Sequence, residues 1–98
     1  MQIEGTFFFD PADRIYKDHF PGNPVVPGSL IVHAFLEAGE KAVFSGDEYT
    51  IENFRFREFI SPGEYSYSIR ILPDHLKCQL YGNRSGVSKT LVTGTIKR

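Results

Sequence analysis

Apolar and polar residues alternate along several segments of the chain, as they do in strands with one buried face. The alternation is clearest at residues 64–72, where Tyr65, Tyr67, Ile69 and Ile71 alternate with Ser66, Ser68 and Arg70. Further strands are predicted at residues 3–9, 49–60, 75–81 and 87–96, with proline- and glycine-containing turns between them. Residues 14–17 are expected to be extended after a turn at residues 10–13. The segments after residue 48 predict an antiparallel meander.

Helical periodicity is confined to residues 29–44. The apolar positions there cover most of the helix circumference, which is typical of a buried helix: Leu30, Ile31, Val32, Ala34, Phe35, Leu36, Ala38, Ala42 and Val43. Residues 45–47, Ser-Gly-Asp, are expected to end the helix. We therefore predict an α+β fold over residues 1–98, a single domain in which a curved antiparallel sheet wraps one long central helix.

The segment before the helix is rich in proline and glycine. It reads His-Phe-Pro-Gly-Asn-Pro-Val-Val-Pro-Gly over residues 19–28. Each proline fixes its own φ near about −65° and keeps the preceding residue out of the helical region, so the loop is stiff. Gly28 opens the helix, and Ser29 is a candidate N-cap. The free N–H groups of the helix start favour developing negative charge, so His19 is a candidate base beside an oxyanion site.

Chain length, net charge and cysteine count exclude several classes of protein. A chain of 98 residues buries only about 60–65% of its unfolded surface, so we expect a dimer. The net charge of −1 and the absence of a basic stripe argue against nucleic-acid or membrane-surface binding. Cys78 is the only cysteine, which excludes an internal disulfide, and the N-terminus lacks the pattern of a signal peptide. We expect a cytoplasmic location.

The proline loop, read with its neighbours, resembles a known family. The spaced pattern His19-Phe20-Pro21-Gly22-x-Pro24-x-x-Pro27-Gly28-x-Leu30-Ile31, followed by a helix and strands, is similar to the hot-dog-fold 3-hydroxyacyl-[acyl-carrier-protein] dehydratases (FabZ/FabA-like). Residues 53–57 and 61–64 resemble that family's second and third strands. The resemblance implies reversible dehydration of a 3-hydroxyacyl thioester to the trans-2-enoyl thioester in lipid synthesis. It implies no metal or redox cofactor, because the thioester carbonyl itself acidifies the α-proton.

The resemblance also implies roles for particular residues. His19 is expected to remove the α-proton, and the N–H of Gly28 or its neighbour to stabilise the enolate oxygen. Phe20, Val26, Pro27 and Ser29 are expected to surround the substrate there. In the family, a Glu or Asp of the opposite subunit protonates the leaving hydroxyl.

This chain departs from the family at the acid. The position fourteen residues after His19 is His33, and Glu37 follows four residues later. Residues at i and i+4 lie on one helix face, about 6 Å apart, so the Glu37 carboxylate favours the imidazolium form of His33. We predict that protonated His33, or Glu37 itself, replaces the family acid. The alternative is that His33 and Glu37 belong only to the polar stripe of the helix, with Glu40 and Lys41.

The remaining candidates favour structural roles. His75 is expected to be an exposed turn residue, Cys78 to be a small core residue, and the histidines lack the spacing of a zinc site. Five phenylalanines, Phe35, Phe44, Phe54, Phe56 and Phe59, either line an acyl tunnel or belong to the core. Six basic residues, Arg55, Arg57, Arg70, Lys77, Arg84 and Lys89, either meet an acidic carrier protein or form a solvated face.

Two alternatives to the dehydratase remain open. One is a non-catalytic hot-dog subunit or acyl-binding module that needs a paralogous partner, and the other is a thioesterase that uses Glu37 to activate water. The expected ligand is a thioester of acyl carrier protein or of coenzyme A, and the sequence does not fix its chain length. We expect a homodimer, a higher homo-oligomer, or a hetero-oligomer with a paralogous dehydratase.

Overall fold

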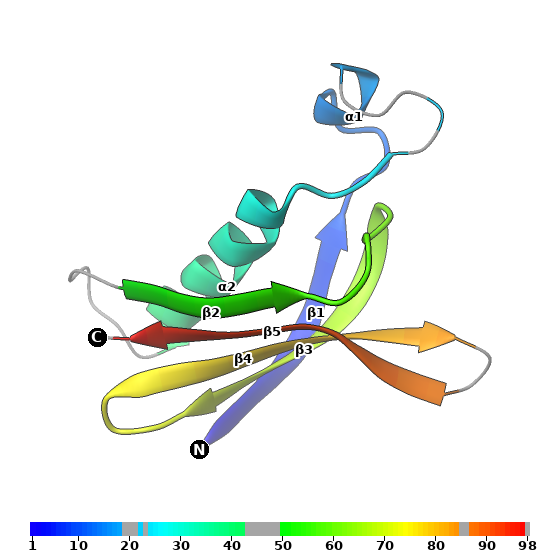
Figure 1. Cartoon of the computed structure of the whole chain (residues 1–98). Helices are drawn as coiled ribbons and strands as arrows, with labels where there is room; N and C mark the ends of the chain where they lie inside the picture. The colour runs from blue at the N-terminus through cyan, green and yellow to red at the C-terminus, as the bar shows by residue number, and fades with distance from the viewer. Residues whose placement is uncertain (19–21, 23, 43–49, 85–86, 98) are drawn as a thin grey trace.

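Five strands and one long helix form the body of the molecule (Figure 1). The computed structural model describes residues 1–18, 22, 24–42, 50–84 and 87–97. Its elements, in chain order, are β1 (Gln2–Phe9), α1 (Ile15–Asp18), α2 (Gly28–Ala42), β2 (Thr50–Phe56), β3 (Gly63–Ile71), β4 (His75–Arg84) and β5 (Val87–Lys97). The predicted α+β class is confirmed, whereas the proposed helix end at residues 45–47 lies outside the described residues.

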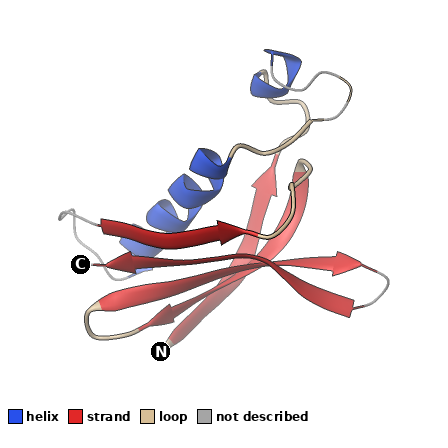
Figure 2. Ribbon diagram, viewed as in Figure 1, coloured by secondary structure: helices blue, strands red, loops and turns tan. Residues whose placement is uncertain are grey.

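The strands form one antiparallel sheet in the order β1-β3-β4-β5-β2. Helix α2 lies along one face of this twisted sheet, as Figure 2 shows. The predicted meander is correct for β3, β4 and β5. It is wrong for β2, which pairs with β5 at the far edge instead of with β3. Alternation sets which face of a strand is buried but not its neighbour, so pairing order is decided by tertiary packing.

The segment after β1 also differs from the prediction. Residues 15–18 form a helical turn, α1, instead of an extended strand. The Asp13 carboxylate accepts a hydrogen bond of 3.1 Å from the N–H of Ile15, which is the geometry of a helix cap. The cap therefore starts a helical turn where an extended segment was expected.

The core lies between α2 and the sheet. From the helix come Ile31 and Phe35, which are 1% and 0% exposed. The Phe35 ring packs edge-on against Phe7 at 5.0 Å and Tyr67 at 6.0 Å between centroids. The sheet contributes the fully buried side chains Ile69, Leu76, Cys78, Leu80, Val92 and Ile96. One face of α2 is therefore buried, which is narrower than the all-round burial that its apolar residues predict.

Strand β2 contains a bulge that shapes this core. Asn53 and Phe54 stand opposite the single residue Gly94, and Asn53 has a φ of 55°. Asparagine tolerates this left-handed conformation better than most residues. The Phe54 ring lies so close to Gly94 that a Cβ there would approach it to 2.4 Å. The strand predicted over residues 49–60 is shorter in the structure and runs from Thr50 to Phe56.

Candidate active site

The start of α2 is held by backbone hydrogen bonds. The Pro27 carbonyl accepts from the N–H groups of Leu30 at 3.0 Å and Ile31 at 3.4 Å, so the helix begins at Gly28. Ser29 therefore lies inside the first turn and is exposed, and its prediction as the N-cap is wrong. The N–H of Val26 donates to the Ile60 carbonyl at 2.7 Å, which ties the end of the proline loop to the β2–β3 connection.

A cavity of about 310 Å³ opens in front of this helix start. Its lining residues are Val25, Val26, Pro27, Gly28, Ile31, Phe56, Glu58, Phe59 and Ile60. Gly28 has a steric role, because a Cβ at this position would lie 3.0 Å from the Phe56 ring. The first N–H groups of a helix have no partner within it and can bind an anionic oxygen. An apolar cavity beside such donors suits an acyl chain with a thioester oxygen at the helix start.

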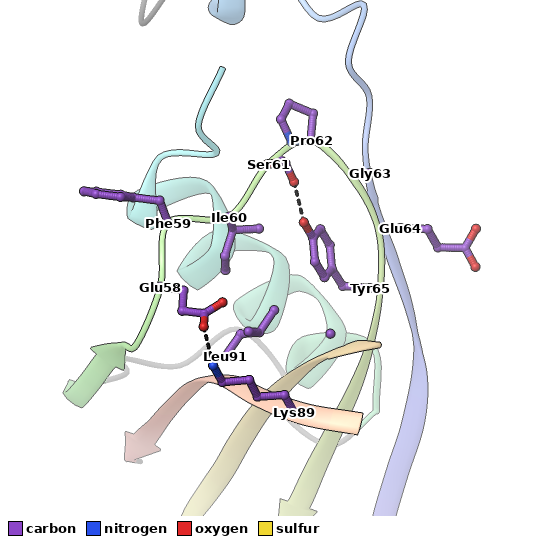
Figure 3. A pocket seen from close by; sticks show the side chains of 11 residues that line it. Glu58, Phe59, Ile60, Ser61, Pro62, Gly63, Glu64, Tyr65, Lys89 and Leu91 are labelled. Atoms are coloured by element: carbon purple, nitrogen blue, oxygen red, sulfur yellow. Dashed lines mark hydrogen bonds and ion pairs between the residues drawn. The ribbon is translucent and has the colours of Figure 1, made fainter. Parts of the chain in front are cut away.

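A second cavity, of about 360 Å³, is lined by residues 58–65 together with Gly82, Lys89 and Leu91 (Figure 3). It shares Glu58, Phe59 and Ile60 with the first cavity. On its walls, the Tyr65 hydroxyl donates a 2.6 Å hydrogen bond to the Ser61 carbonyl, and Glu58 forms an ion pair with Lys89 of β5. We call the first cavity, in front of the helix start, the apolar cavity and the second one the polar cavity.

Glu58 is not among the site residues predicted from the sequence. It is the one ionisable side chain that lines the apolar cavity, among the residues that the structure describes. A glutamate directly before the apolar residues Phe59 and Ile60 is a weak signal that could have drawn attention to it.

His33 and Glu37 form the pair that their spacing predicts. The His33 Nε2 lies 2.8 Å from the Glu37 Oε1, and the side chains are 66% and 59% exposed. Neither residue lines the apolar cavity of the same chain. Glu37 borders a separate depression beside Phe7 and Tyr67. A single chain therefore does not bring this pair to the helix start, and His19 and Phe20 lie outside the described residues.

The other two titratable candidates are structural in this fold. His75 begins β4, and its Nδ1 lies 2.6 Å from the Asp74 carboxylate, a hydrogen bond that lowers the pKa of Asp74. Its side chain is only 26% exposed, so the expected exposed turn residue is instead half-buried at the strand start. Cys78 is 1% exposed, and burial raises the pKa of its thiol to about 12, which confirms its core role. Within the described ranges, no cluster of three or more metal-ligating side chains occurs.

The aromatic and basic candidates divide by location. Phe35 belongs to the core and Phe54 packs against it, whereas Phe56 and Phe59 border the apolar cavity and are 44% and 87% exposed. Phe44 lies outside the described residues. Among the basic residues, Arg55, Arg57 and Lys77 line a groove on the sheet and Lys89 is ion-paired with Glu58. No described helix is long and apolar enough to span a bilayer.

The chain is similar to a known family of dehydratases. A family model described as ApeI-like, ApeI dehydratase, matches residues 1–86. The 3-hydroxyacyl-[acyl-carrier-protein] dehydratase FabZ of Oenococcus oeni is 33% identical over 73 residues, which cover 66% of this chain and 52% of the relative. The FabZ of Ligilactobacillus salivarius is 32% identical over 89 residues, covering 83% of this chain and 59% of the relative. The chain thus spans between half and three fifths of these curated relatives.

Solved structures agree on the fold. A chain of the dehydratase heterocomplex ApeI:P from Xenorhabdus doucetiae superimposes with a TM-score of 0.80 at 20% identity, covering 98% of this chain and 85% of its own length. An uncharacterised protein from Erwinia carotovora subsp. atroseptica gives the same TM-score of 0.80 at 24% identity, over 98% and 81% of the two chains. The hot-dog fold expected from the sequence is therefore confirmed. The family match over residues 1–86 shows that the chain belongs to the ApeI-like dehydratase family.

Proposed function

We propose that this protein catalyses the reversible dehydration of a 3-hydroxyacyl thioester to the trans-2-enoyl thioester. The observation that carries the proposal is the apolar cavity in front of the helix start, lined by Val26, Pro27 and Gly28. It combines an acyl-sized apolar space with backbone donors for a developing enolate oxygen. Membership of a dehydratase family supports this use of the cavity.

In the proposed mechanism, the His19 imidazole accepts the α-proton while the thioester oxygen becomes an enolate. The N–H of Gly28 or its neighbour stabilises that oxygen. The enolate electrons then form the C2–C3 double bond, the C3–O bond breaks, and the hydroxyl takes a proton and leaves as water. The thioester carbonyl supplies the acidity of the α-proton, so neither metal nor redox chemistry is required.

We assign the proton for the leaving hydroxyl to the pair His33 and Glu37. The His33 Nε2 and the Glu37 Oε1 lie 2.8 Å apart, so the imidazole and the carboxylate form one acid–base pair on the helix. Because the pair does not line the apolar cavity of its own chain, we infer that it serves the cavity of a second subunit.

An exposed strand edge supports such a dimer. Among the strands that the structure describes, β2 ends the sheet with β5 as its one neighbour, and an unpaired strand edge is a template for another strand. Ile51 and Phe56 of β2 are 45% and 44% exposed. We propose that β2 and its neighbours contact a second copy or a paralogous dehydratase subunit, and that the substrate is carried by acyl carrier protein, as the names of the relatives suggest, or by coenzyme A.

One assay tests the proposal. The purified protein is incubated with 3-hydroxyacyl and enoyl thioesters, while enoyl absorbance and free thiol are followed together. A change in enoyl absorbance without thiol release is expected. Release of thiol would indicate a thioesterase and contradict the proposal.

A specific observation favours a second candidate, a subunit that is inactive by itself. One structurally similar chain belongs to a dehydratase heterocomplex, and His33 stands where the family places a carboxylate. This candidate predicts no change in either signal with the isolated protein. Activity would then appear when a paralogous dehydratase subunit is added, and it would be lost again if that partner's own catalytic carboxylate were removed.

A further inference from the structure

We propose that a groove on the outer face of the sheet binds a phosphate ester or diphosphate group of a small ligand. The groove has a volume of about 360 Å³, and its cations are Arg55 of β2, Arg57 directly after β2, and Lys77 of β4. We call it the basic groove. It shares no lining residue with the apolar cavity, so the proposal does not rest on the proposed function.

The basic groove lies on the face of the sheet away from α2. On β4, Cys78 is 1% exposed and belongs to the core, whereas its neighbour Lys77 is exposed. Phe56 lines the apolar cavity, and Arg55 and Arg57 on either side of it are exposed. Successive side chains of a strand point to opposite faces of the sheet. The three cations therefore share the outer face.

Strand β5 runs between the cations. It lies between β2 and β4 in the sheet (Figure 1). Arg55 is opposite Thr93 of β5, and Lys77 is opposite Thr95. The backbone N–H of Arg57 donates a 2.9 Å hydrogen bond to a carbonyl of β5. Neighbouring strands are about 4.8 Å apart, so β2 and β4 are separated by about 10 Å. One anionic group above β5 is therefore within reach of long cationic side chains from both sides.

The cations of the basic groove have no partner in the protein. No ion pair or side-chain hydrogen bond joins Arg55, Arg57 or Lys77 to another residue that the structure describes. Glu52 of β2 stands opposite Thr95 but is not in the groove wall, and no other described carboxylate lines it. The chain as a whole has a net charge of −1, so the groove is a local excess of positive charge. A cleft lined by charge of one sign attracts counter-ions.

The donors in the groove suit phosphate oxygens. A guanidinium presents two parallel N–H groups that match a phosphate, and Lys77 adds a point charge. The hydroxyls of Thr93 and Thr95 and the amide of Asn53 line the same groove and supply neutral donors. A volume of about 360 Å³ is typical of a small-molecule site, whereas a stable protein interface needs about 800 Å² from each partner. The groove therefore favours a small phosphorylated ligand over an acidic protein.

The basic groove stays open in the proposed dimer. Edge-to-edge pairing of β2 uses hydrogen bonds in the plane of the sheet, and the side chains of the groove stand off its face. Two kinds of molecule carry a suitable group: a free phosphorylated metabolite, and the phosphorylated pantetheine arm of an acyl carrier.

Equilibrium binding to the purified protein at about 50 mM salt tests the proposal. Inorganic diphosphate should bind at one saturable site per chain, with a Kd of about 1 mM or lower that rises with salt. Arg55→Gln should weaken binding about tenfold, and adding Lys77→Gln should weaken it further. Arg55→Lys, which keeps the charge but loses the paired donors, should have an intermediate effect.

Two comparisons make the result specific. Arg14→Gln is the matched control, because Arg14 is exposed, lies outside the groove and loses the same charge. Its Kd should stay within about twofold of the original. Pantetheine 4′-phosphate and inorganic phosphate distinguish the two sources. Tighter binding of the pantetheine compound indicates the carrier arm, and equal affinity indicates a free ligand.

Four outcomes overturn the proposal. They are the absence of saturable binding by any phosphate probe, unchanged binding in Arg55→Gln/Lys77→Gln, an equal loss in Arg55→Gln and Arg14→Gln, and a polyglutamate peptide that binds through Arg55 when the phosphate probes do not. The last result would assign the groove to an acidic protein. Dehydration is measured separately, so loss of phosphate binding leaves the proposed function untouched.

Discussion

The two faces of helix α2 differ in their surroundings. On one face, Ile31 and Phe35 are 1% and 0% exposed and pack against the sheet. On the other, His33 and Glu37 are 66% and 59% exposed and contact each other. Core substitutions cost far more stability than changes to exposed ion pairs. The buried face therefore fixes the position of the helix, whereas the exposed face can carry chemistry at little cost to folding.

The different placement of the helix start and of the His33–Glu37 pair leaves the proposed site incomplete within one chain. The helix start faces the apolar cavity, and the pair His33 and Glu37 does not line it. A rigid helix cannot turn both features toward one ligand, so a second subunit is needed if the pair is the acid. Four experiments compare the buried side, which includes Cys78 and Gly94 of the sheet, with the exposed pair on α2. They are ordered by their expected effect on the free energy of unfolding.

Phe35→Ala should have the largest effect. Removing this fully buried ring deletes its contacts with Phe7 and Tyr67 and leaves a cavity, so we expect a loss of about 3–5 kcal/mol. Chemical denaturation at a fixed protein concentration measures the change. Leu36→Ala, on the neighbouring and only partly buried face, is the matched control and should lose less. Equal losses would contradict the assignment of the buried face.

Gly94→Ala should have the second largest effect. The added Cβ would lie 2.4 Å from the Phe54 ring, so the ring or the β2 bulge must move, at a cost of about 1–3 kcal/mol. The same denaturation experiment applies. The double variant Phe54→Leu/Gly94→Ala should be less destabilised than the sum of its two single changes, and simple additivity would show that the ring is not the obstacle.

Cys78 should make the stability of the buried side depend on alkaline pH. Its thiol has an ordinary pKa of 9.0 and a folded pKa of about 12, so above pH 9 the unfolded state loses a proton that the folded state keeps. The contribution of the neutral thiol to the free energy of unfolding is fully present below pH 9 and is lost as the pH rises toward 12. Between pH 8 and pH 10 the free energy of unfolding falls by about 1 kcal/mol for this reason.

Denaturation curves at these two pH values measure the loss. Cys78→Ala is the comparison, because the tyrosines titrate in both proteins and the thiol in only one. If the two proteins lose stability in parallel, the folded thiol ionises near its ordinary pKa and the prediction is wrong.

His33→Ala and Glu37→Gln should have the smallest effect on stability. An exposed ion pair at i and i+4 contributes only about 0.5 kcal/mol or less. If the pair supplies the acid, the dehydration rate should nevertheless fall by about 100-fold or more. Glu40→Gln, an exposed change on the same helix, is the control and should affect neither quantity. A full rate in His33→Ala would show that the pair is only a polar stripe.

The sequence predicted the local features of the candidate site but not how they come together. The proline loop led to the helix start, and the i, i+4 spacing led to the pair of His33 and Glu37, because both are fixed by residues close in sequence. The place of Glu58 beside the helix start was missed because it depends on the packing of the β2–β3 connection against the proline loop. The N-cap at Ser29 was misplaced because the Pro27 carbonyl already accepts the first helical hydrogen bonds.

Local patterns in the sequence are enough to assign the class of elements and most of their positions, because strand alternation and helical periodicity reflect which side of each element is buried. They also identify the family, through the spacing of prolines and glycines that a stiff loop requires. Tertiary packing sets three other features: β2 pairs with β5, a bulge directs Phe54 to Gly94, and Glu58 lines the cavity at the helix start. Each of these depends on residues far apart in the chain, and no local pattern encodes such contacts.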